Sequence, residues 1–181
     1  SCCGILQFEE GEILIDGTSV KEQPLACKAK PAYIPDNPDL YEFLSGIRYL
    51  NFIADIYKVP KEERQERIRK YADMFEITGD LAQPVSAYSH GMKQKLALSC
   101  ALIHKPDILF LDEPTTGVDP VSRKEFWEML RRLKEQGITI IASTPIMDEA
   151  RQCDRIAFIN EGQIHGIDTC LLYTSDAADD K

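Results

Sequence analysis

One short apolar segment constrains the fold more than any other part of the chain. Residues Ile108–Leu111 are all large and apolar, and two acidic residues, Asp112 and Glu113, follow them directly. An apolar segment of this length between Pro106 and a polar turn is typical of a strand that is buried on both faces. Such strands occur in parallel sheets covered by helices, so this segment predicts an α/β fold with a mostly parallel sheet.

Short strand-like segments alternate along the chain with longer helical patterns. Four further strands are predicted, at Glu12–Asp16, Ala32–Pro35, Ile138–Ser143 and Arg155–Ile159. From about residue 40 to residue 105 the pattern is almost wholly helical, which predicts a helical subdomain inserted into the α/β frame. The 181 residues suffice for about one domain, and we assign residues 1–168 to it.

The first predicted helix is apolar on more than one side. Two neighbouring stripes run along it, Leu50, Ile53, Ala54 and Tyr57 in one and Tyr49, Phe52, Ile53 and Ile56 in the other. One stripe can pack into the helix's own domain, so the other needs a second cover. Either a neighbouring helix or a partner protein would provide it.

The net charge of the chain argues against nucleic acid as a direct partner. Acidic residues number 30 and basic residues 21, which gives a formal charge of −9, the wrong sign for binding a phosphate backbone. Every apolar segment is far shorter than the roughly 20 residues that a membrane-spanning helix needs, so a membrane role requires a partner. The six cysteines lack CxxC and metal-ligand spacing, which argues against a zinc site and against a disulfide framework.

Two adjacent carboxylates end the central predicted strand. In open α/β sheets, ligands bind at the carboxyl ends of the strands, where Asp112 and Glu113 lie. Successive strand residues point to opposite sides, so one acid can hold the water shell of a metal while the other acts on a nucleophilic water. The alternative is a strand that merely enters a polar turn.

A second candidate site begins the helix that precedes this strand. Ser89 is a suitable N-cap, and Gly91 would let a ligand approach the unpaired N–H groups of the first helical turn. This arrangement suits a phosphate, although an ordinary helix cap has the same sequence pattern. A later helix begins in a similar way, with Asp119 as N-cap and Pro120 at its first position.

In combination and order, these segments resemble the ATP-binding subunits of ABC transporters. Tyr88–Lys95 resembles the signature motif, and Ile108–Pro120 resembles the Walker B strand and the D-loop. Tyr33–Pro38 stands at the place of the Q-loop and Ser143–Ala150 at the place of the switch loop, and Gly11–Gly17 also matches. The resemblance covers nearly all of residues 4–168. It implies a P-loop NTPase-type three-layer fold with a mostly parallel sheet and an inserted α-helical subdomain.

The resemblance assigns roles to individual residues. Asp112 would hold Mg²⁺ through water, with Asp36 near the same ion, and Glu113 would polarise the water that attacks the γ-phosphate of ATP. The residues that it assigns to nucleotide binding and to the contact between two ATP-binding subunits are Ser89, His90, Gly91, Met92 and Asp119.

The sequence also departs from the family pattern. Nowhere does it contain G-x-x-x-x-G-K-[ST], and the resemblance puts the lysine of that motif just upstream of Ser1. We therefore expect a truncated chain that is inactive alone. Asp36 stands where the family has glutamine, His90 where it has glycine, and Pro145 where it has histidine. Residues 169–181 do not fit the family and are interpreted as a non-native or disordered tail.

The expected function is that of an ATP-binding subunit of an ABC exporter. It would hydrolyse MgATP as a homo- or heterodimer and drive export through a separate transmembrane permease subunit, on the cytoplasmic face of the membrane. One alternative is a soluble ABC-type ATPase that acts on ribosomes or DNA. The other is a non-hydrolysing interaction module, which the departures at Asp36, His90 and Pro145 favour.

Overall fold

The computed structural model describes residues 2–169, which fall into two compact units. The first unit extends to Ser143 and contains a parallel sheet and most of the helices. The second begins at Thr144 and contains a short helix, α6 (Met147–Ala150), followed by an antiparallel hairpin of β6 (Arg155–Asn160) and β7 (Gln163–Thr169). Of the expected tail, Thr169 ends β7, and residues 170–181 lie outside the described residues.

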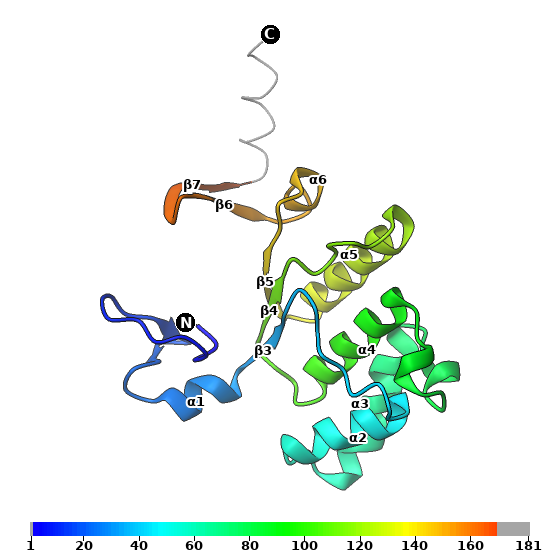
Figure 1. The fold of residues 1–181 in the computed structure, drawn as a ribbon. Coiled ribbons are helices and arrows are strands. Elements are labelled where there is room, and N and C mark those ends of the chain that lie inside the picture. Colours follow the sequence, from blue (N-terminus) through cyan, green and yellow to red (C-terminus); the bar gives the residue numbers. More distant parts are fainter. Residues whose placement is uncertain (1, 170–181) are drawn as a thin grey trace. The chain divides into compact units, whose positions relative to one another are not determined.

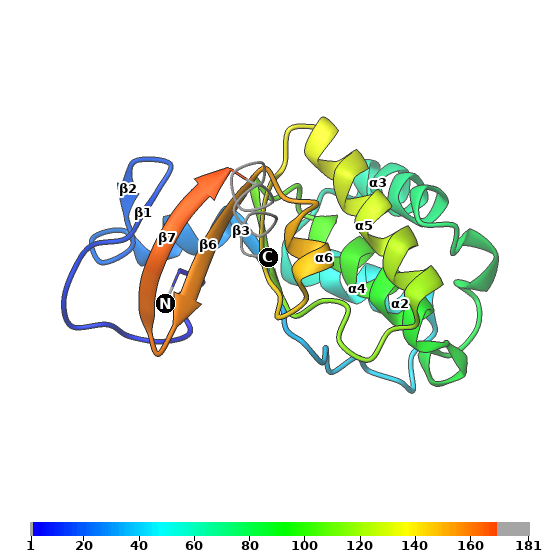
Figure 2. The ribbon, with the colours of Figure 1, turned by 90° about the horizontal axis from the view of Figure 1, so that it is seen from above.

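The parallel sheet confirms the predicted fold class. Its strands are β3 (Pro31–Ile34), β4 (Ile108–Asp112) and β5 (Thr139–Ser143), in the order β3-β4-β5, and both pairings are parallel. Leu109 and Leu111 of the central strand are buried, as its apolar sequence predicts. Helices α4 and α5 lie on one side of this sheet in both ribbon views (Figures 1 and 2).

The predicted strand Glu12–Asp16 is instead a short hairpin. β1 covers only Leu14–Ile15 and pairs in antiparallel fashion with β2 (Thr18–Ser19). The two residues between the strands, Asp16 and Gly17, have φ values of 51° and 71°. Positive φ at both central residues is the geometry of a two-residue hairpin turn, which Asp-Gly favours, so the chain reverses there. A short helix, α1 (Pro24–Ala29), connects the hairpin to β3.

Three α-helices and two short 3₁₀ helices occupy residues 46–102. They are α2 (Gly46–Ile56), α3 (Lys61–Met74), η1 (Thr78–Asp80), η2 (Val85–Ala87) and α4 (His90–Leu102). Their core contains Leu50 and Ala54 of α2 and Leu96 of α4, all fully buried. On the second stripe of α2, Phe52 and Ile56 stay exposed. In the described residues, therefore, one face of α2 is packed and the other is at the surface.

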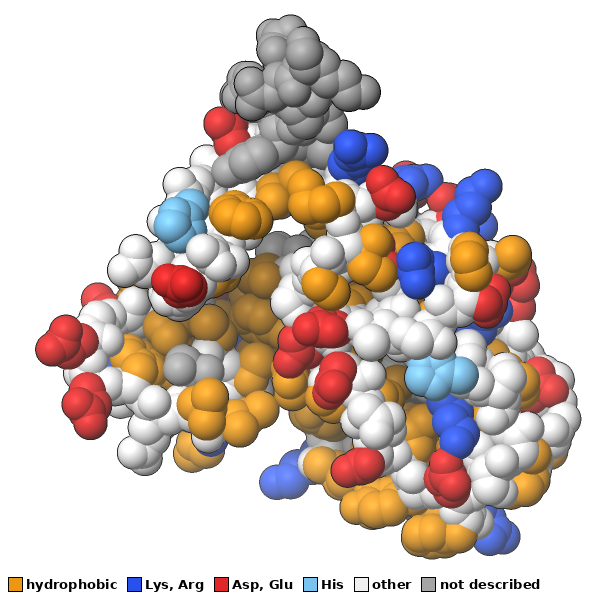
Figure 3. All heavy atoms as spheres, turned by 45° about the horizontal axis from the view of Figure 1, so that its top comes forward, with side chains coloured by type: hydrophobic (Ala, Val, Ile, Leu, Met, Phe, Trp, Pro, Cys, Tyr) orange, Lys and Arg blue, Asp and Glu red, His pale blue; other side chains and the backbone are white. Residues whose placement is uncertain are grey.

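Helix α5 (Pro120–Glu135) crosses from the end of β4 back to the start of β5. Its buried residues are Phe126, Trp127, Met129, Leu130 and Leu133, which include every core residue that the helical spacing predicts. Gly137, with φ at 92°, follows the helix and adopts the left-handed conformation that ends many helices. On the face seen in Figure 3, acidic and basic side chains are interspersed with apolar ones.

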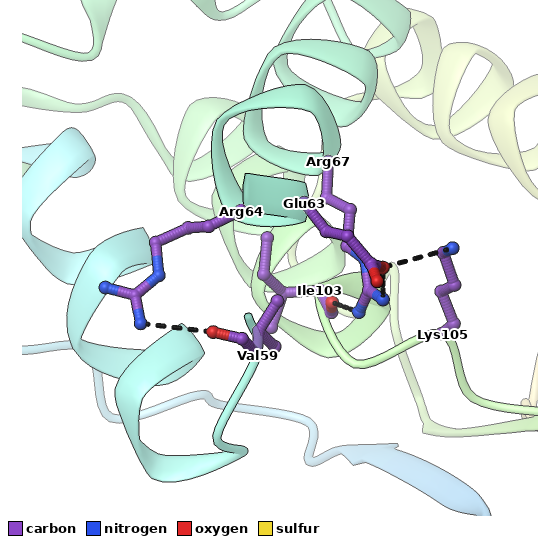
Figure 4. A network of polar contacts seen from close by, with 6 residues as sticks. All are labelled: Val59, Glu63, Arg64, Arg67, Ile103 and Lys105. Atoms are coloured by element: carbon purple, nitrogen blue, oxygen red, sulfur yellow. Dashed lines mark hydrogen bonds and ion pairs between the residues drawn. The ribbon is translucent and has the colours of Figure 1, made fainter. Parts of the chain in front are cut away.

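Arg67 fastens α3 to the end of α4. One guanidinium nitrogen donates to the carbonyl oxygen of Ile103 at 2.9 Å, and another donates to Glu63, which Lys105 also approaches at 3.7 Å (Figure 4). Nearby, Arg64 donates to the carbonyl oxygen of Val59 at 3.3 Å. Because only 14% of the Arg67 side chain is exposed, its bond to Ile103 is shielded from competing water.

We expect Arg67→Ala to lower the free energy of unfolding by about 1–3 kcal/mol, because the carbonyl of Ile103 loses its charged donor. Urea unfolding followed by circular dichroism measures this change. Arg69→Ala is the matched control, because Arg69 lies on the same helix and is exposed; it should change the value by less than about 0.5 kcal/mol. Equal losses in both variants would contradict this role of Arg67.

Candidate functional site

Three parallel strands end at one edge of the sheet and bring polar residues together there. Asp112 ends β4, and Ser143, its register partner, ends β5. Asp36 lies two residues beyond the end of β3 and is exposed. The parallel pairing therefore collects side chains from positions far apart in the sequence, as the position of the two acids predicts.

Both carboxylate oxygens of Asp112 accept hydrogen bonds. The hydroxyl of Ser143 donates to Oδ1 at 2.6 Å, and the hydroxyl of Tyr33, on β3, donates to Oδ2 at 3.3 Å. Burial, followed by the negative charge of Asp112, raises the pKa of Tyr33 above its usual value of 10, and the charge of Asp36 adds to this effect. Tyr33 therefore remains a protonated donor at neutral pH.

Glu113 has an unusual backbone conformation. Its φ is 42°, in the left-handed region that side chains other than glycine rarely adopt. Its N–H donates to the carbonyl oxygen and to the hydroxyl of Ser143, both at 3.1 Å. The hydroxyl of Thr116 donates to its Oε2, also at 3.1 Å. These three contacts hold both the backbone and the carboxylate of Glu113, and such a conformation persists only where its surroundings enforce it.

The N-terminus of α4 is capped as predicted. The hydroxyl of Ser89 accepts a hydrogen bond from the N–H of Met92 at 3.2 Å. A cavity of about 220 Å³ opens beside this end of the helix, lined by Ser89, Gly91, Met92, Gln94, Lys95, Ser122, Glu125, Phe126 and Met129. His90, the first residue of α4, is exposed and is not part of this lining.

Gly91 is not required by the packing of the protein. A Cβ atom there would meet only Ser122 of α5, at 3.8 Å from Oγ and 3.9 Å from Cβ, which are ordinary van der Waals distances. Its φ also lies outside the left-handed region. Because neither crowding nor backbone conformation explains the glycine, the close approach of a ligand remains the physical reason for it.

Asp119 caps α5. Its Oδ1 accepts from the N–H groups of Val121 and Ser122, both at 3.0 Å. Hydrogen bonds from the side chain and backbone of Ser122 lower the pKa of Asp119 below its usual value of 3.8. Since Ser122 also lines the cavity at Gly91, the cap of α5 and the start of α4 border the same space.

Gln94 connects the two groups of candidate residues. Its side chain is buried, and its amide nitrogen donates to the carbonyl oxygen of Pro114, the residue after Glu113. Gln94 lines the cavity beside α4, and it also lines a small hollow of about 10 Å³ that includes Asp36 and Pro114. The helix that carries Ser89 is thus fixed to the chain that carries the carboxylates.

Sequence reasoning assigned no role to Tyr33, Gln94, Ser122 or Ser143. The strand register offers a signal for two of them, because Ser143 ends the strand beside Asp112 and Tyr33 lies on the strand at its other side. Gln94 and Ser122 follow two N-caps by three to five residues, and only the packing of α4 against α5 brings them to one cavity.

The carboxylates fit a hydrated metal better than a fully protein-bound one. Residues 2–169 contain no group of three or more His, Cys, Asp or Glu side chains that could hold an ion. Asp112 and Asp36 supply hard oxygen donors of the kind that Mg²⁺ prefers, and Mg²⁺ usually keeps several waters and takes phosphate ligands as well. In the same residues, every helix is too short or too polar to cross a membrane.

A parallel sheet with two carboxylates after its central strand, beside a helix capped by serine, defines an α/β protein of the nucleotide-binding type. The sequence profile of the ABC transporter family matches residues 1–116, more than half of the chain. The chain belongs to this family.

Two relatives show where in the family the chain lies. It is 36% identical over 162 residues to the Probable multidrug ABC transporter ATP-binding protein YbhF of Escherichia coli, which is 90% of this chain and 28% of that protein. It is 30% identical over 167 residues to the Linearmycin resistance ATP-binding protein LnrL of Bacillus subtilis, 92% of this chain and 54% of the relative. The chain thus spans between about a quarter and a half of these relatives' lengths.

Solved structures have the same fold. CbiO1 of Clostridium perfringens, described as part of the ABC transporter complex cbiONQ, matches with a TM-score of 0.88 at 27% identity, over 97% of this chain and 72% of that one. The dimeric ATP-binding cassette MJ0796, bound to ADP and Pi, matches with a TM-score of 0.75 at 22% identity, over 89% of this chain and 74% of its own. The fold is therefore that of the P-loop NTPase-type ATP-binding domains of ABC transporters.

The hydrogen bonds to Asp119 make stability depend on pH. Because its pKa is lower in the folded than in the unfolded chain, Asp119 stabilises the fold above about pH 4, and this contribution disappears as the pH falls through the folded pKa. In Asp119→Asn the cap remains but no longer titrates, so thermal unfolding between pH 6 and 2.5 should lose part of its pH dependence. Asp39→Asn, at an exposed carboxyl elsewhere, is the control; an equal effect there would contradict the assignment.

Proposed function

We propose that the protein is the ATP-binding subunit of an ABC exporter, which hydrolyses MgATP as a dimer and drives transport through a separate transmembrane permease subunit. Membership of the family and relatives named for multidrug transport and linearmycin resistance support this function. The subunit would lie on the cytoplasmic face of the membrane, held there by the permease.

The observation that carries the proposal is the pair of carboxylates after β4. Glu113, held by Ser143 and Thr116, orients and polarises the water that attacks the γ-phosphate. Asp112, with Asp36 nearby, holds the water shell of Mg²⁺. When bound, this ion neutralises charge on the phosphates as the bond to the leaving oxygen breaks.

The start of α4 supplies the second half of the proposed site. The backbone N–H groups of His90 and Gly91, in the first helical turn, lack carbonyl partners within the helix. Together with the hydroxyl of Ser89 they can bind the γ-phosphate of a nucleotide held mainly by a second subunit, and Met92 and Asp119 border the same contact. The ordinary spacing around Gly91 supports this, because a ligand explains the glycine where the packing does not.

A non-hydrolysing interaction module is the second candidate. Pro145 has no N–H and no polar side chain, so it cannot donate a hydrogen bond to a γ-phosphate as histidine would. His90 and Asp36 depart from the family pattern as well. A protein of this kind would bind ATP and dimerise without turnover.

Glu113→Gln distinguishes the two candidates. In the full gene product we expect this variant to bind ATP as the parent does but to lose at least about 100-fold in kcat, because an amide cannot take up a proton from the attacking water. Phosphate release and nucleotide binding are measured side by side. Glu135→Gln, the same change at an exposed position on α5, should keep full activity. ATP binding without turnover in the parent would favour the second candidate.

The exposed stripe of α2 is the proposed contact with the permease. Ile56 is 56% exposed, so Ile56→Glu should leave folding and basal turnover unchanged while it removes most of the stimulation of ATP turnover by the permease. ATPase assays with and without the reconstituted permease measure this. Leu25→Glu, at an equally exposed apolar residue of α1, is the control; loss of stimulation in both variants, or in neither, would contradict the assignment to α2.

A further inference from the structure

We propose that Ser143 is a positioning residue that holds both carboxylate residues of the site through a single hydroxyl group. This inference rests on the proposed ATPase function. Ser143 ends β5 and is the register partner of Asp112, so its side chain lies beside the end of β4. It is exposed, and no role in the packing of the core explains it.

The Ser143 hydroxyl makes two different hydrogen bonds at once. Its proton goes to Oδ1 of Asp112 at 2.6 Å, a short distance typical of a hydroxyl that donates to a charged carboxylate. Its oxygen accepts the N–H of Glu113 at 3.1 Å. A hydroxyl has one proton and two lone pairs, so both bonds are satisfied together. The positions of the two neighbouring acids are therefore coupled through one atom, Oγ of Ser143.

For Glu113, the hydroxyl supports a backbone conformation that is costly by itself. At φ 42° a residue with a side chain is disfavoured by about 1–2 kcal/mol in the left-handed region. The N–H of Glu113 has two acceptors on Ser143, the carbonyl oxygen and the hydroxyl. Loss of the hydroxyl leaves only the carbonyl, so the backbone can relax and the carboxylate can turn away from its water.

For Asp112, the hydroxyl fixes the rotation of the carboxylate. Oδ1 is held at 2.6 Å by Ser143, whereas Oδ2 has the longer contact of 3.3 Å with Tyr33. Each oxygen can accept more than one hydrogen bond, so a water of the hydrated ion can still reach it. A carboxylate that rotates freely would hold that water less well, and we expect the need for Mg²⁺ to rise.

The decisive comparison is between two variants of nearly the same shape, Ser143→Thr and Ser143→Val. Both side chains are β-branched and suit a strand, but only threonine retains the hydroxyl. In the full gene product, we expect Ser143→Val to lower kcat by about tenfold or more and to raise the Mg²⁺ concentration at half-maximal activity, as the loss of one hydrogen bond to a charged group implies. Ser143→Thr should stay within about threefold of the parent.

Two controls separate positioning from stability. Thr139→Val removes a hydroxyl from the opposite end of the same strand and should change neither kcat nor the Mg²⁺ requirement. Tyr33→Phe removes the longer bond to Asp112 and should raise the Mg²⁺ requirement less than Ser143→Val does. Melting temperatures of all variants are compared, because a purely structural role of Ser143 would lower stability without changing the Mg²⁺ dependence.

The outcomes separate this inference from the function on which it rests. Rescue by threonine together with loss in valine supports the positioning role. Equal activity in Ser143→Val and Ser143→Thr, whether high or low, overturns it while ATP turnover in the parent still supports the proposed function. Absence of ATP turnover in the parent overturns the proposed function and this inference with it.

Discussion

The parallel pairing of β4 with β3 and β5 is the constraint on which the rest of the site depends. It aligns the carboxyl ends of three strands, so that Asp112 meets Ser143 from one side and Tyr33 from the other. A slip of one residue in either register would point these side chains to the opposite face of the sheet. The buried apolar residues of β4, Leu109 and Leu111, prevent such a slip because it would expose them to water.

The sequence predicts those parts of the fold whose cause is local. The strand Ile108–Leu111 and the caps Ser89 and Asp119 appear as expected, because an apolar run and a side chain that bonds its own backbone need no distant partner. The hairpin at Asp16 was missed because its turn interrupts what was interpreted as a single strand.

The candidate site is only half predictable in this way. Asp112 and Glu113 stand out in the sequence, but the hydroxyls that hold them come from positions about 30 and 80 residues away. Likewise, the bond of Gln94 to Pro114 depends on how α4 packs. No local pattern encodes these contacts, because the tertiary fold creates them. The roles of Asp36, His90 and Asp119 toward nucleotide and partner subunit remain predictions.

The outer edge of β5 has a consequence for how the chain associates. In the described sheet β5 pairs with β4 only, and Ile141, in the middle of the strand, is half exposed. An edge strand that presents backbone N–H and C=O groups next to apolar side chains is a template for one more strand. Sheet extension at β5 is therefore the easiest way for this unit to join another polypeptide segment, and in concentrated solution the same edge favours aggregation of separate copies.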